Sequence, residues 1–384
     1  MQNKKIVFLI NSLDGGGAER VVSTLLNNLV DSYDCYLILL EDKISYELDK
    51  RIKVIMLDNS SFTQNGIVKF LSLPLLGYKL SKIIKEYNFT QVVSFLYRSN
   101  YINILSKYLS KQKVIISERI APSSMYADNL LSSKMSKYLI KILYNKADLI
   151  IPVSKAIKND LEINFNIKTK QIVIYNPYDI DNIVKLSKED IAIDIDKKNS
   201  IITVGSLGKR KNHQLLINAF SKIDKQMKLY ILGVGEEEKN LKELTISLNI
   251  QDRVIFLGFD NNPYKYLSKC TIFILSSNSE GFPNVLVEAM ICGCSVISTD
   301  CLSGPREILA PDSNFSYQLK NNIELVKYGI LTPIGNSDNM KKAMNLLIQD
   351  INLRDTYKQK SLQRVNDLDI KSILEEWEDI ICAG

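Results

Sequence analysis

The stretch KIVFLINSLDGGGAERVVSTLLNNL, residues 5–29, combines a strand, a glycine turn and a helix. It opens on an almost continuous apolar run, which is typical of a parallel strand buried on both faces. After the three glycines, Val21, Leu25 and Leu29 recur with helical spacing. A buried strand that leads through a turn into an amphipathic helix is the repeating unit of a doubly wound α/β sheet.

Short β-branched runs of the same kind recur along the whole chain. In the first half we predict strands at 5–10, 35–40, 53–57, 91–96, 113–117, 148–153 and 172–175. After a polar stretch at 179–199 the rhythm restarts, with strands predicted at 200–205, 228–232, 254–257, 271–275 and 295–298. We therefore predict an α/β protein of two tandem doubly wound (Rossmann-like) parallel-sheet domains facing a central cleft, where ligands bind. The expected domains are 1–185 and 186–384, and an amphipathic helix predicted from about 361 packs against either of them.

Length and composition agree with two soluble globular domains. The 384 residues exceed what one hydrophobic core usually serves, and 46% of them are apolar against 24% charged. No apolar run reaches the roughly 18 residues that a membrane span needs, and the start has no secretory cleavage pattern. We expect reduced cysteines in the cytoplasm. Cys292-Gly-Cys294 lacks the partners of a metal site and is interpreted as two small buried side chains.

The first half of the chain is basic. Residues 1–185 hold 25 Lys and Arg against 17 Asp and Glu, whereas the remainder holds 24 against 26. In the predicted helices at 70–87 and 133–146 the lysines alternate with apolar residues, a pattern typical of surfaces that rest on anionic lipid. A solvated helix face explains the pattern equally well. Nucleic acid is a weaker interpretation, because no binding motif appears.

Two glycine segments follow predicted strands. Gly15-Gly16-Gly17 opens a helix, and its backbone N–H groups together with the helix dipole favour an anion such as a phosphate. A tight turn without a ligand is the alternative. The segment has neither the ending of a P-loop nor the dinucleotide spacing. Gly233-Val-Gly235 is interpreted as a turn that borders the cleft, because three glutamates follow it.

The most informative segment is Glu280-Gly-Phe-Pro-Asn-Val-Leu-Val-Glu288. Pro283 and Asn284 are typical of a helix start, so Glu280 is predicted to lie in the preceding loop and Glu288 about one turn inside. Carboxylates placed there accept hydrogen bonds from sugar or ribose hydroxyls. The structural alternative is helix-terminus electrostatics for Glu280 and a solvated Glu288.

This segment resembles the E-x7-E signature of the retaining glycosyltransferases of family 4, which have the GT-B fold. Residues 205–219 resemble the family's strand and loop at the donor diphosphate, and 303–308 resemble the segment after the signature. Residues 41–47, 99–102 and 259–266 are similar to those of N-acetylgalactosaminyltransferases that extend lipid-linked glycans in bacterial protein N-glycosylation. Capsule and O-antigen transferases share some of these strings.

The resemblance implies roles for individual residues. It makes the first domain the acceptor-binding one and the second the nucleotide-sugar-binding one. Two departures from the family are clear: Ser206 stands where many relatives have arginine, and Ser117-Glu118-Arg119 stands where many have histidine, the only histidine being His213. The implied catalytic residues are Lys211, Glu280 and Arg210; the donor-binding residues are Gly16, Gly17, Ser206, Lys209, Phe282, Pro283, Asn284 and Glu288; the acceptor-binding residues are Gly15, Arg20, Glu118 and Arg119.

The implied reaction moves a sugar, with N-acetylgalactosamine favoured, from a UDP-sugar to a polyprenyl-diphosphate-linked glycan, with retention at the anomeric carbon. The expected partners are these two substrates and the anionic inner face of the cytoplasmic membrane, where the protein is peripheral. We expect no cofactor and no metal, because Asp194-Ile-Asp196 and Asp367-Leu-Asp369 fall outside the predicted site. A sugar-nucleotide epimerase of similar fold, or a binding protein without turnover, are the rival predictions.

Overall fold

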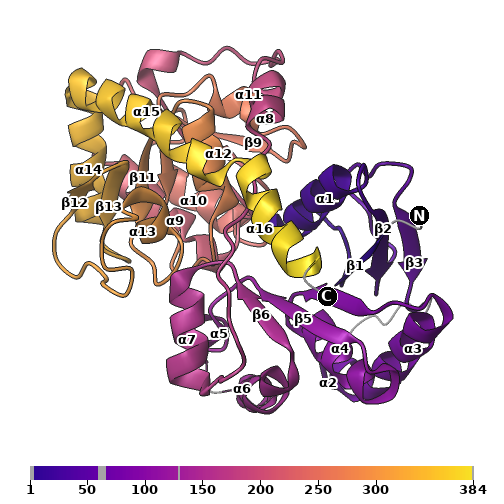
Figure 1. The fold of residues 1–384 in the computed structure, drawn as a ribbon. Helices are drawn as coiled ribbons and strands as arrows, with labels where there is room; N and C mark the ends of the chain where they lie inside the picture. Colours follow the sequence, from indigo (N-terminus) through magenta and orange to yellow (C-terminus); the bar gives the residue numbers. More distant parts are fainter. Residues whose placement is uncertain (1–3, 59–65, 129, 383–384) are drawn as a thin grey trace. The chain divides into compact units, whose positions relative to one another are not determined.

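The structure, a computed structural model, describes residues 4–58, 66–128 and 130–382, which form two compact units (Figure 1). Unit 1 contains the residues up to Pro177 together with those from Lys371 onward, and unit 2 spans Tyr178–Ile370. Along the sequence, the boundary between the units therefore lies between Pro177 and Tyr178, before the predicted boundary at 185. The reason is that α8 (Ile180–Leu186) packs on helices of unit 2, and Asn262 Nδ2 donates a hydrogen bond to the Leu186 carbonyl at 2.9 Å.

Unit 1 is built on a sheet of parallel strands in the order β3-β2-β1-β4-β5-β6. This is the 3-2-1-4-5-6 order of a doubly wound fold, as the buried apolar runs predict. The strands are β1 (Lys5–Ile10), β2 (Asp34–Leu39), β3 (Lys53–Met56), β4 (Gln91–Phe95), β5 (Lys113–Glu118) and β6 (Leu149–Pro152). The helices are α1 (Gly17–Leu29), α2 (Gly66–Leu71), α3 (Leu73–Glu86), α4 (Tyr97–Ser110), α5 (Pro122–Met125), α6 (Leu131–Leu143), α7 (Lys155–Phe165) and α16 (Ile370–Cys382), with a 3-10 turn at Tyr144–Lys146.

The core of unit 1 contains the single tryptophan of the chain, Trp377 on α16. Its ring lies 6.2 Å from that of Phe8 on β1 and 5.9 Å from that of Phe95 on β4, and all three side chains are fully buried. Aromatic burial of this kind attaches the end of the chain firmly to unit 1.

Unit 2 repeats the arrangement. Its sheet has the order β12-β13-β11-β10-β7-β8-β9, parallel except for the β12–β13 hairpin. The strands are β7 (Ser200–Val204), β8 (Lys228–Leu232), β9 (Val254–Gly258), β10 (Ile272–Leu275), β11 (Ser295–Thr299), β12 (Glu324–Val326) and β13 (Gly329–Thr332). The remaining helices are η2 (Lys197–Asn199), η3 (Lys209–Lys211), α9 (His213–Phe220), α10 (Glu238–Ser247), α11 (Tyr264–Leu267), α12 (Asn284–Ile291), α13 (Pro305–Leu309), α14 (Ser337–Gln349), α15 (Ile351–Val365) and η4 (Asn366–Leu368).

Two predicted elements are wrong in detail. The segment 172–175 is no strand: the Ile172 and Ile174 amides donate to β6, but Pro152 has no N–H to continue the ladder. The helix predicted at 361–381 is interrupted by η4 and Asp369, because Asp369 pairs with Tyr178 in an isolated bridge. Strands β12 and β13 were not predicted, since they are short and weakly patterned.

Of the helices that the structure describes, none has the length and apolar character needed to cross a membrane.

Candidate active site

The predicted donor residues of unit 2 lie on two loops that leave neighbouring strands. β7 ends at Val204 and leads into η3, and β10 ends at Leu275 and leads into the loop before α12. The two strands pair in parallel, yet the order of connection reverses between them. This is the switch point of a doubly wound sheet, where the loops at the carboxyl ends of the strands diverge and ligands bind.

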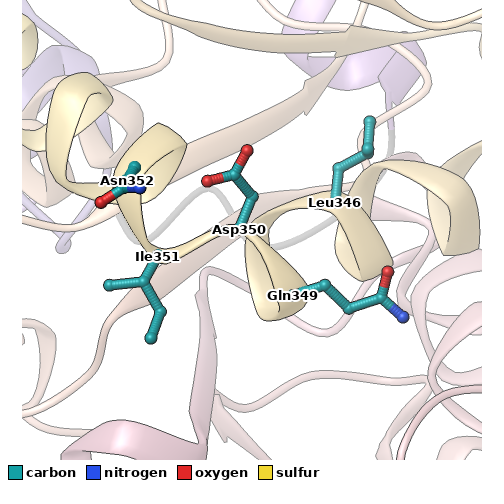
Figure 2. A pocket seen from close by; sticks show the side chains of 5 residues that line it. All are labelled: Leu346, Gln349, Asp350, Ile351 and Asn352. Atoms are coloured by element: carbon teal, nitrogen blue, oxygen red, sulfur yellow. The ribbon is translucent and has the colours of Figure 1, made fainter.

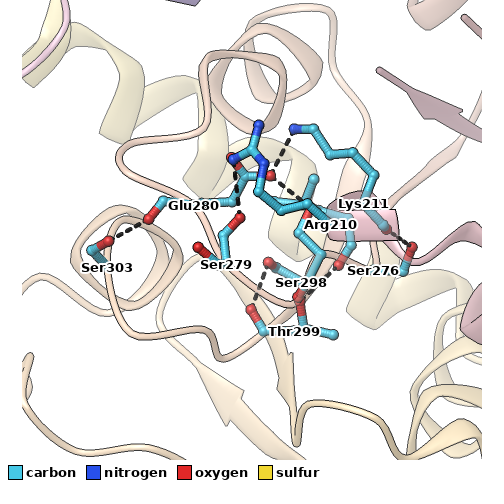
Figure 3. A network of polar contacts seen from close by, with 10 residues as sticks. Arg210, Lys211, Ser276, Ser279, Glu280, Ser298, Thr299 and Ser303 are labelled. Atoms are coloured by element: carbon cyan, nitrogen blue, oxygen red, sulfur yellow. Dashed lines mark hydrogen bonds and ion pairs between the residues drawn. The ribbon is translucent and has the colours of Figure 1, made fainter. Parts of the chain in front are cut away.

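An ion cluster joins these two loops (Figure 3). Lys211 Nζ lies 2.6 Å from Glu280 Oε1, and Arg210 NH1 lies 3.4 Å from Glu280 Oε2. The carboxylate also accepts a hydrogen bond from Ser277 Oγ at 2.6 Å. Sequence analysis missed Ser277, although a polar residue directly after a buried strand is a recognisable signal. The structure thus brings together all three predicted catalytic residues.

Burial and charge act in opposite directions on Glu280. The side chain is only 6% exposed, and burial alone would raise its pKa. The charges of Lys211 and Arg210, with the hydrogen bonds from Lys211 and Ser277, outweigh burial and hold the pKa of Glu280 below its usual value. Glu280 is therefore an anion at neutral pH. It can accept hydrogen bonds and cannot serve as a general acid.

Backbone contacts hold the cluster in place. The Asn278 amide donates to the Arg210 carbonyl at 2.8 Å, and Ser276 Oγ donates to the Lys211 carbonyl at 2.9 Å. Ser303 Oγ donates to the Glu280 carbonyl from the segment before α13. Contacts within the fold itself thus hold the cluster, which is the preorganisation that electrostatic catalysis needs. Ser206 and Lys209 of the first loop are exposed.

The start of α12 follows Glu280 as the sequence predicts. Pro283 caps the helix, Asn284 is its first residue, and Phe282 is buried. Asn284 Oδ1 accepts a hydrogen bond from Tyr178 Oη at 3.0 Å, a contact that sequence analysis missed. Glu288 lies one turn inside the helix and is 2% exposed, so it is buried and not solvated.

The Gly233-Val-Gly235 turn serves close packing. A Cβ on Gly233, whose φ is +147°, would lie 2.0 Å from the Gly205 carbonyl oxygen, and one on Gly235 would lie 2.5 Å from the Leu207 oxygen. Only glycine allows the loops after β7 and β8 to approach so closely. The nearby His213 is buried, and this burial together with the charge of Lys211 lowers its pKa to about 4. His213 is therefore neutral.

In unit 1 the glycine turn lies at the start of α1. Gly16 is the N-cap, and a Cβ on it would lie 2.2 Å from Glu19 Oε2, so the Glu19 carboxylate covers the helix start. Burial raises the pKa of Glu19. Tyr46 Oη donates to the Gly16 carbonyl at 2.9 Å, and the guanidinium of Arg20 stacks over the Tyr46 ring at 5.7 Å. Gly15 and Gly17 are exposed.

Glu118 and Arg119, at the end of β5, are buried among polar side chains. Glu118 Oε2 accepts from Tyr144 Oη at 2.5 Å, and Oε1 accepts from the Arg119 amide at 3.1 Å. Arg119 donates to Asn176 Oδ1 and to Ser117 Oγ. Both residues are thus engaged by internal contacts, and acceptor binding by them stays a prediction.

The free energy of unfolding of unit 1 should depend on Glu118. Burial raises its pKa to about 7 from an ordinary value of 4.5, and its hydrogen bonds offset only part of this. At pH values between these two pKa values, the folded protein therefore keeps a proton on Glu118 that the unfolded chain has lost. Stability should fall by roughly 3 kcal/mol as the pH rises through this window.

Urea unfolding followed by the fluorescence of Trp377 reports on unit 1 alone, since Trp377 is the only tryptophan. The difference in unfolding free energy between about pH 5 and about pH 8 should shrink in Glu118→Gln and persist in the exposed control Glu162→Gln. An unchanged difference in Glu118→Gln would show that this carboxyl titrates normally.

Within residues 4–58, 66–128 and 130–382, no group of three or more His, Cys, Asp or Glu side chains could hold a metal ion. Asp196 accepts from the Lys198 amide in η2, and Asp367 pairs with Arg364 at 2.9 Å. Both predicted D-x-D segments thus have local structural roles. Metal independence of the reaction stays a prediction.

A hollow of about 620 Å³ lies elsewhere, at the junction of α14 and α15 (Figure 2). None of the predicted site residues line it. Its lining residues are Leu346, Gln349, Asp350, Ile351 and Asn352.

Comparison with known proteins identifies the class. A family model described as Glycosyltransferase Family 4 matches residues 15–182, and one described as Glycosyl transferases group 1 matches residues 187–364. The chain is 40% identical over 368 residues to the N-acetylgalactosamine-N,N'-diacetylbacillosaminyl-diphospho-undecaprenol 4-alpha-N-acetylgalactosaminyltransferase of Campylobacter jejuni, covering 95% of this chain and 96% of the relative. A second transferase of that organism, acting on a GalNAc-GalNAc-diNAcBac-PP-undecaprenol glycan, is 27% identical over 98% of both chains.

Solved structures agree on the fold. The Anabaena protein HepE in complex with UDP superposes with a TM-score of 0.79 at 20% identity, over 99% of this chain and all of that one. The two tandem doubly wound sheets are those of the GT-B fold. The chain belongs to glycosyltransferase family 4. Membership of this family leaves the epimerase and the binding protein without support.

Proposed function

We propose that the enzyme transfers N-acetylgalactosamine from UDP-N-acetylgalactosamine to a polyprenyl-diphosphate-linked glycan, with retention at the anomeric carbon. The observation that carries the proposal is the cluster of Lys211, Arg210 and buried Glu280 at the switch point of unit 2. The Campylobacter relative supports the choice of sugar and acceptor, because its identity of 40% extends over both units.

The charges of the cluster suit the chemistry. In the reaction the bond between the anomeric carbon and the β-phosphate oxygen breaks, and the acceptor oxygen bonds to the same face of that carbon. Negative charge develops on the departing diphosphate, where Lys211 and Arg210 stabilise it. Glu280 accepts hydrogen bonds from hydroxyls of the transferred sugar, and Glu288 from the ribose. The acceptor proton passes to the leaving phosphate, so no enzymic nucleophile is required.

The experiment is a screen of UDP-N-acetylgalactosamine, UDP-N-acetylglucosamine and UDP-galactose with extracted polyprenyl-diphosphate-linked glycans, read by mass spectrometry. We expect a gain of one N-acetylhexosamine, and undiminished activity in EDTA. UDP-galactose tests the alternative of a lipopolysaccharide enzyme, since relatives at 28–31% identity are lipopolysaccharide 1,6-galactosyltransferases. Hydrolysis of the donor without any product on lipid would refute the proposal.

Two helices of unit 1 suit a peripheral place on the inner membrane face. On α6 the exposed apolar side chains Leu131, Met135, Tyr138 and Ile142 are spaced so that they share one face. Lys134, Lys137 and Lys141 flank this stripe, while Ile140 and Leu143 face the core. An apolar stripe beside lysines is the pattern of a helix that lies in an anionic lipid surface.

The second helix, α3, repeats the pattern. Leu75 and Tyr78 are exposed on it, Leu71 of α2 is exposed one turn earlier, and Lys82 lies 4.6 Å from the centre of the Tyr78 ring. These two helices lie in the lysine-bearing segments that the sequence analysis describes. Their exposed side chains can therefore be changed to test whether the helices rest on anionic lipid or are solvated helix faces.

Replacing two residues of the α6 stripe should weaken membrane binding. The double variant Leu131→Glu/Tyr138→Glu removes apolar area and adds charge that anionic lipid repels, so we expect at least a 10-fold loss of partitioning into phosphatidylglycerol vesicles. Sedimentation with vesicles measures it. The control Ile163→Glu, at a 70% exposed apolar site on α7, should bind as the unmodified protein does. Equal binding by all three proteins would leave α6 as a solvated helix.

A further inference from the structure

A turn from a third segment of unit 2 packs against the loop that carries Glu280. This turn, formed by Ser303 and Gly304, lies between β11 and α13. Ser303 is 2% exposed, and its hydroxyl donates a hydrogen bond to the Glu280 carbonyl (Figure 3). Glu280 is thus held at both ends, because Lys211 pairs with its carboxylate.

Gly304 brings the turn close to the residues that follow Glu280. Its φ of +89° and ψ of −66° form a conformation that residues with a side chain rarely adopt. A Cβ on Gly304 would lie 2.5 Å from Pro283 Cδ and 2.8 Å from the Gly281 carbonyl oxygen, closer than non-bonded atoms normally approach. Only glycine therefore allows the turn to lie against the backbone of the Glu280 loop.

The turn is itself fixed to the rest of unit 2 on both sides. Arg306 Nε donates to Asp300 Oδ1 at 3.1 Å, its NH2 donates to Asp300 Oδ2 at 2.7 Å, and both side chains are buried. Arg364 of α15 donates to the Glu307 and Ile308 carbonyls, each at 3.1 Å. Because the turn is anchored in this way, it limits where the backbone of the Glu280 loop can lie.

We propose that the Ser303–Gly304 turn is a positioning element for the sugar donor: it sets the backbone of Glu280 and thereby the place where the Glu280 carboxylate meets hydroxyls of the transferred sugar. The inference rests on the proposed function, because it assumes that Glu280 contacts that sugar. Neither residue of the turn has to touch the donor. A turn with only a structural role would stabilise unit 2 and leave the reaction of a folded variant unchanged.

A double-mutant cycle of Ser303→Ala with Glu280→Gln tests the inference. Alone, Ser303→Ala should lower kcat/KM for the UDP-sugar about five-fold, the effect of losing one hydrogen bond. In the Glu280→Gln background it should have little further effect, because residues that act through one contact are not additive. Its effect on urea unfolding, followed by circular dichroism, should be the same in both backgrounds, since glutamine keeps the backbone carbonyl.

The matched control is Ser295→Ala. Ser295 is another buried serine of unit 2, and its Oγ donates to the Arg354 carbonyl at 2.7 Å. Ser295→Ala should lower the free energy of unfolding much as Ser303→Ala does, and it should leave kcat/KM unchanged. Ser303→Cys replaces Ser303→Ala in the cycle if the alanine variant does not fold, because a thiol is a weaker donor than a hydroxyl.

The inference and the proposed function fail by different results. An unchanged kcat/KM in Ser303→Ala, an equal loss in Ser295→Ala, or additive effects in the cycle would overturn the inference, and the transfer reaction of the unmodified enzyme would still stand. If the unmodified enzyme adds no N-acetylhexosamine to a lipid-linked glycan, the proposed function fails and the inference with it.

Discussion

Lys211→Ala is expected to lower kcat by about 10²- to 10³-fold while the protein stays folded. The Lys211 side chain is 14% exposed and its Nζ is held 2.6 Å from Glu280 Oε1, so the position of its charge is fixed by the fold. A fixed charge costs no reorganisation when negative charge develops on the leaving diphosphate. Glu280 keeps Arg210 and Ser277 as partners in the variant, which limits the cost of the broken pair.

Initial rates at saturating donor and acceptor give kcat, and circular dichroism checks the fold. Lys211→Met serves if the alanine variant is unstable, because it keeps the length of the side chain and removes only the charge. The matched control is Lys222→Ala, which breaks the exposed pair with Asp338 at 2.8 Å and should leave kcat unchanged. Near-normal kcat in a folded Lys211 variant would refute the catalytic assignment.

Glu280→Gln is expected to lower kcat/KM by on the order of 10- to 10²-fold, the usual cost of losing a hydrogen bond to a charged group. The amide keeps the size of the side chain and one acceptor oxygen. It loses the charge that directs Lys211 and the second oxygen available to a sugar hydroxyl. Glu280→Gln changes the contacts of the donor sugar and of the phosphate together. The loss of kcat/KM for the UDP-sugar should therefore be larger than the loss of affinity for UDP alone.

Calorimetric titration with UDP measures UDP binding alone, so it separates a change in UDP affinity from the loss of kcat/KM. The control Glu324→Gln changes another carboxylate of unit 2, which lies 2.8 Å from the guanidinium of Arg306 and is not among the predicted site residues. It should leave kcat/KM within about two-fold of the unmodified enzyme, as expected for a change outside the site. A Glu280→Gln enzyme as active as this control would show that Glu280 has only a structural role.

Much of the fold could be predicted because buried parallel strands carry a strong signal. The run Lys5–Ile10 is a strand with the predicted bounds, and so is Lys228–Leu232. The failures have local causes. Pro152 interrupts the ladder of hydrogen bonds beside 172–175, and the apolar pattern of that segment looks the same with or without a complete ladder. The pairing of Asp369 with Tyr178 interrupts the helix predicted at 361–381, although its apolar pattern continues.

The candidate site divides in the same way. The E-x7-E segment and the loop with Lys211 are recognisable because their residues are close in sequence. Ser277 and Glu280 are only three positions apart, and their contact depends on how a single loop turns after β10. The contact of Tyr178 with Asn284 joins residues more than a hundred positions apart. The hydrogen bond that Glu118 accepts likewise comes from Tyr144, which its own segment does not contain.

A crystal structure of the enzyme with UDP-N-acetylgalactosamine tests the central claim most directly. We predict a diphosphate within hydrogen-bonding distance of Lys211 Nζ and sugar hydroxyls on Glu280. A donor bound away from Lys211 and Glu280 would contradict the account.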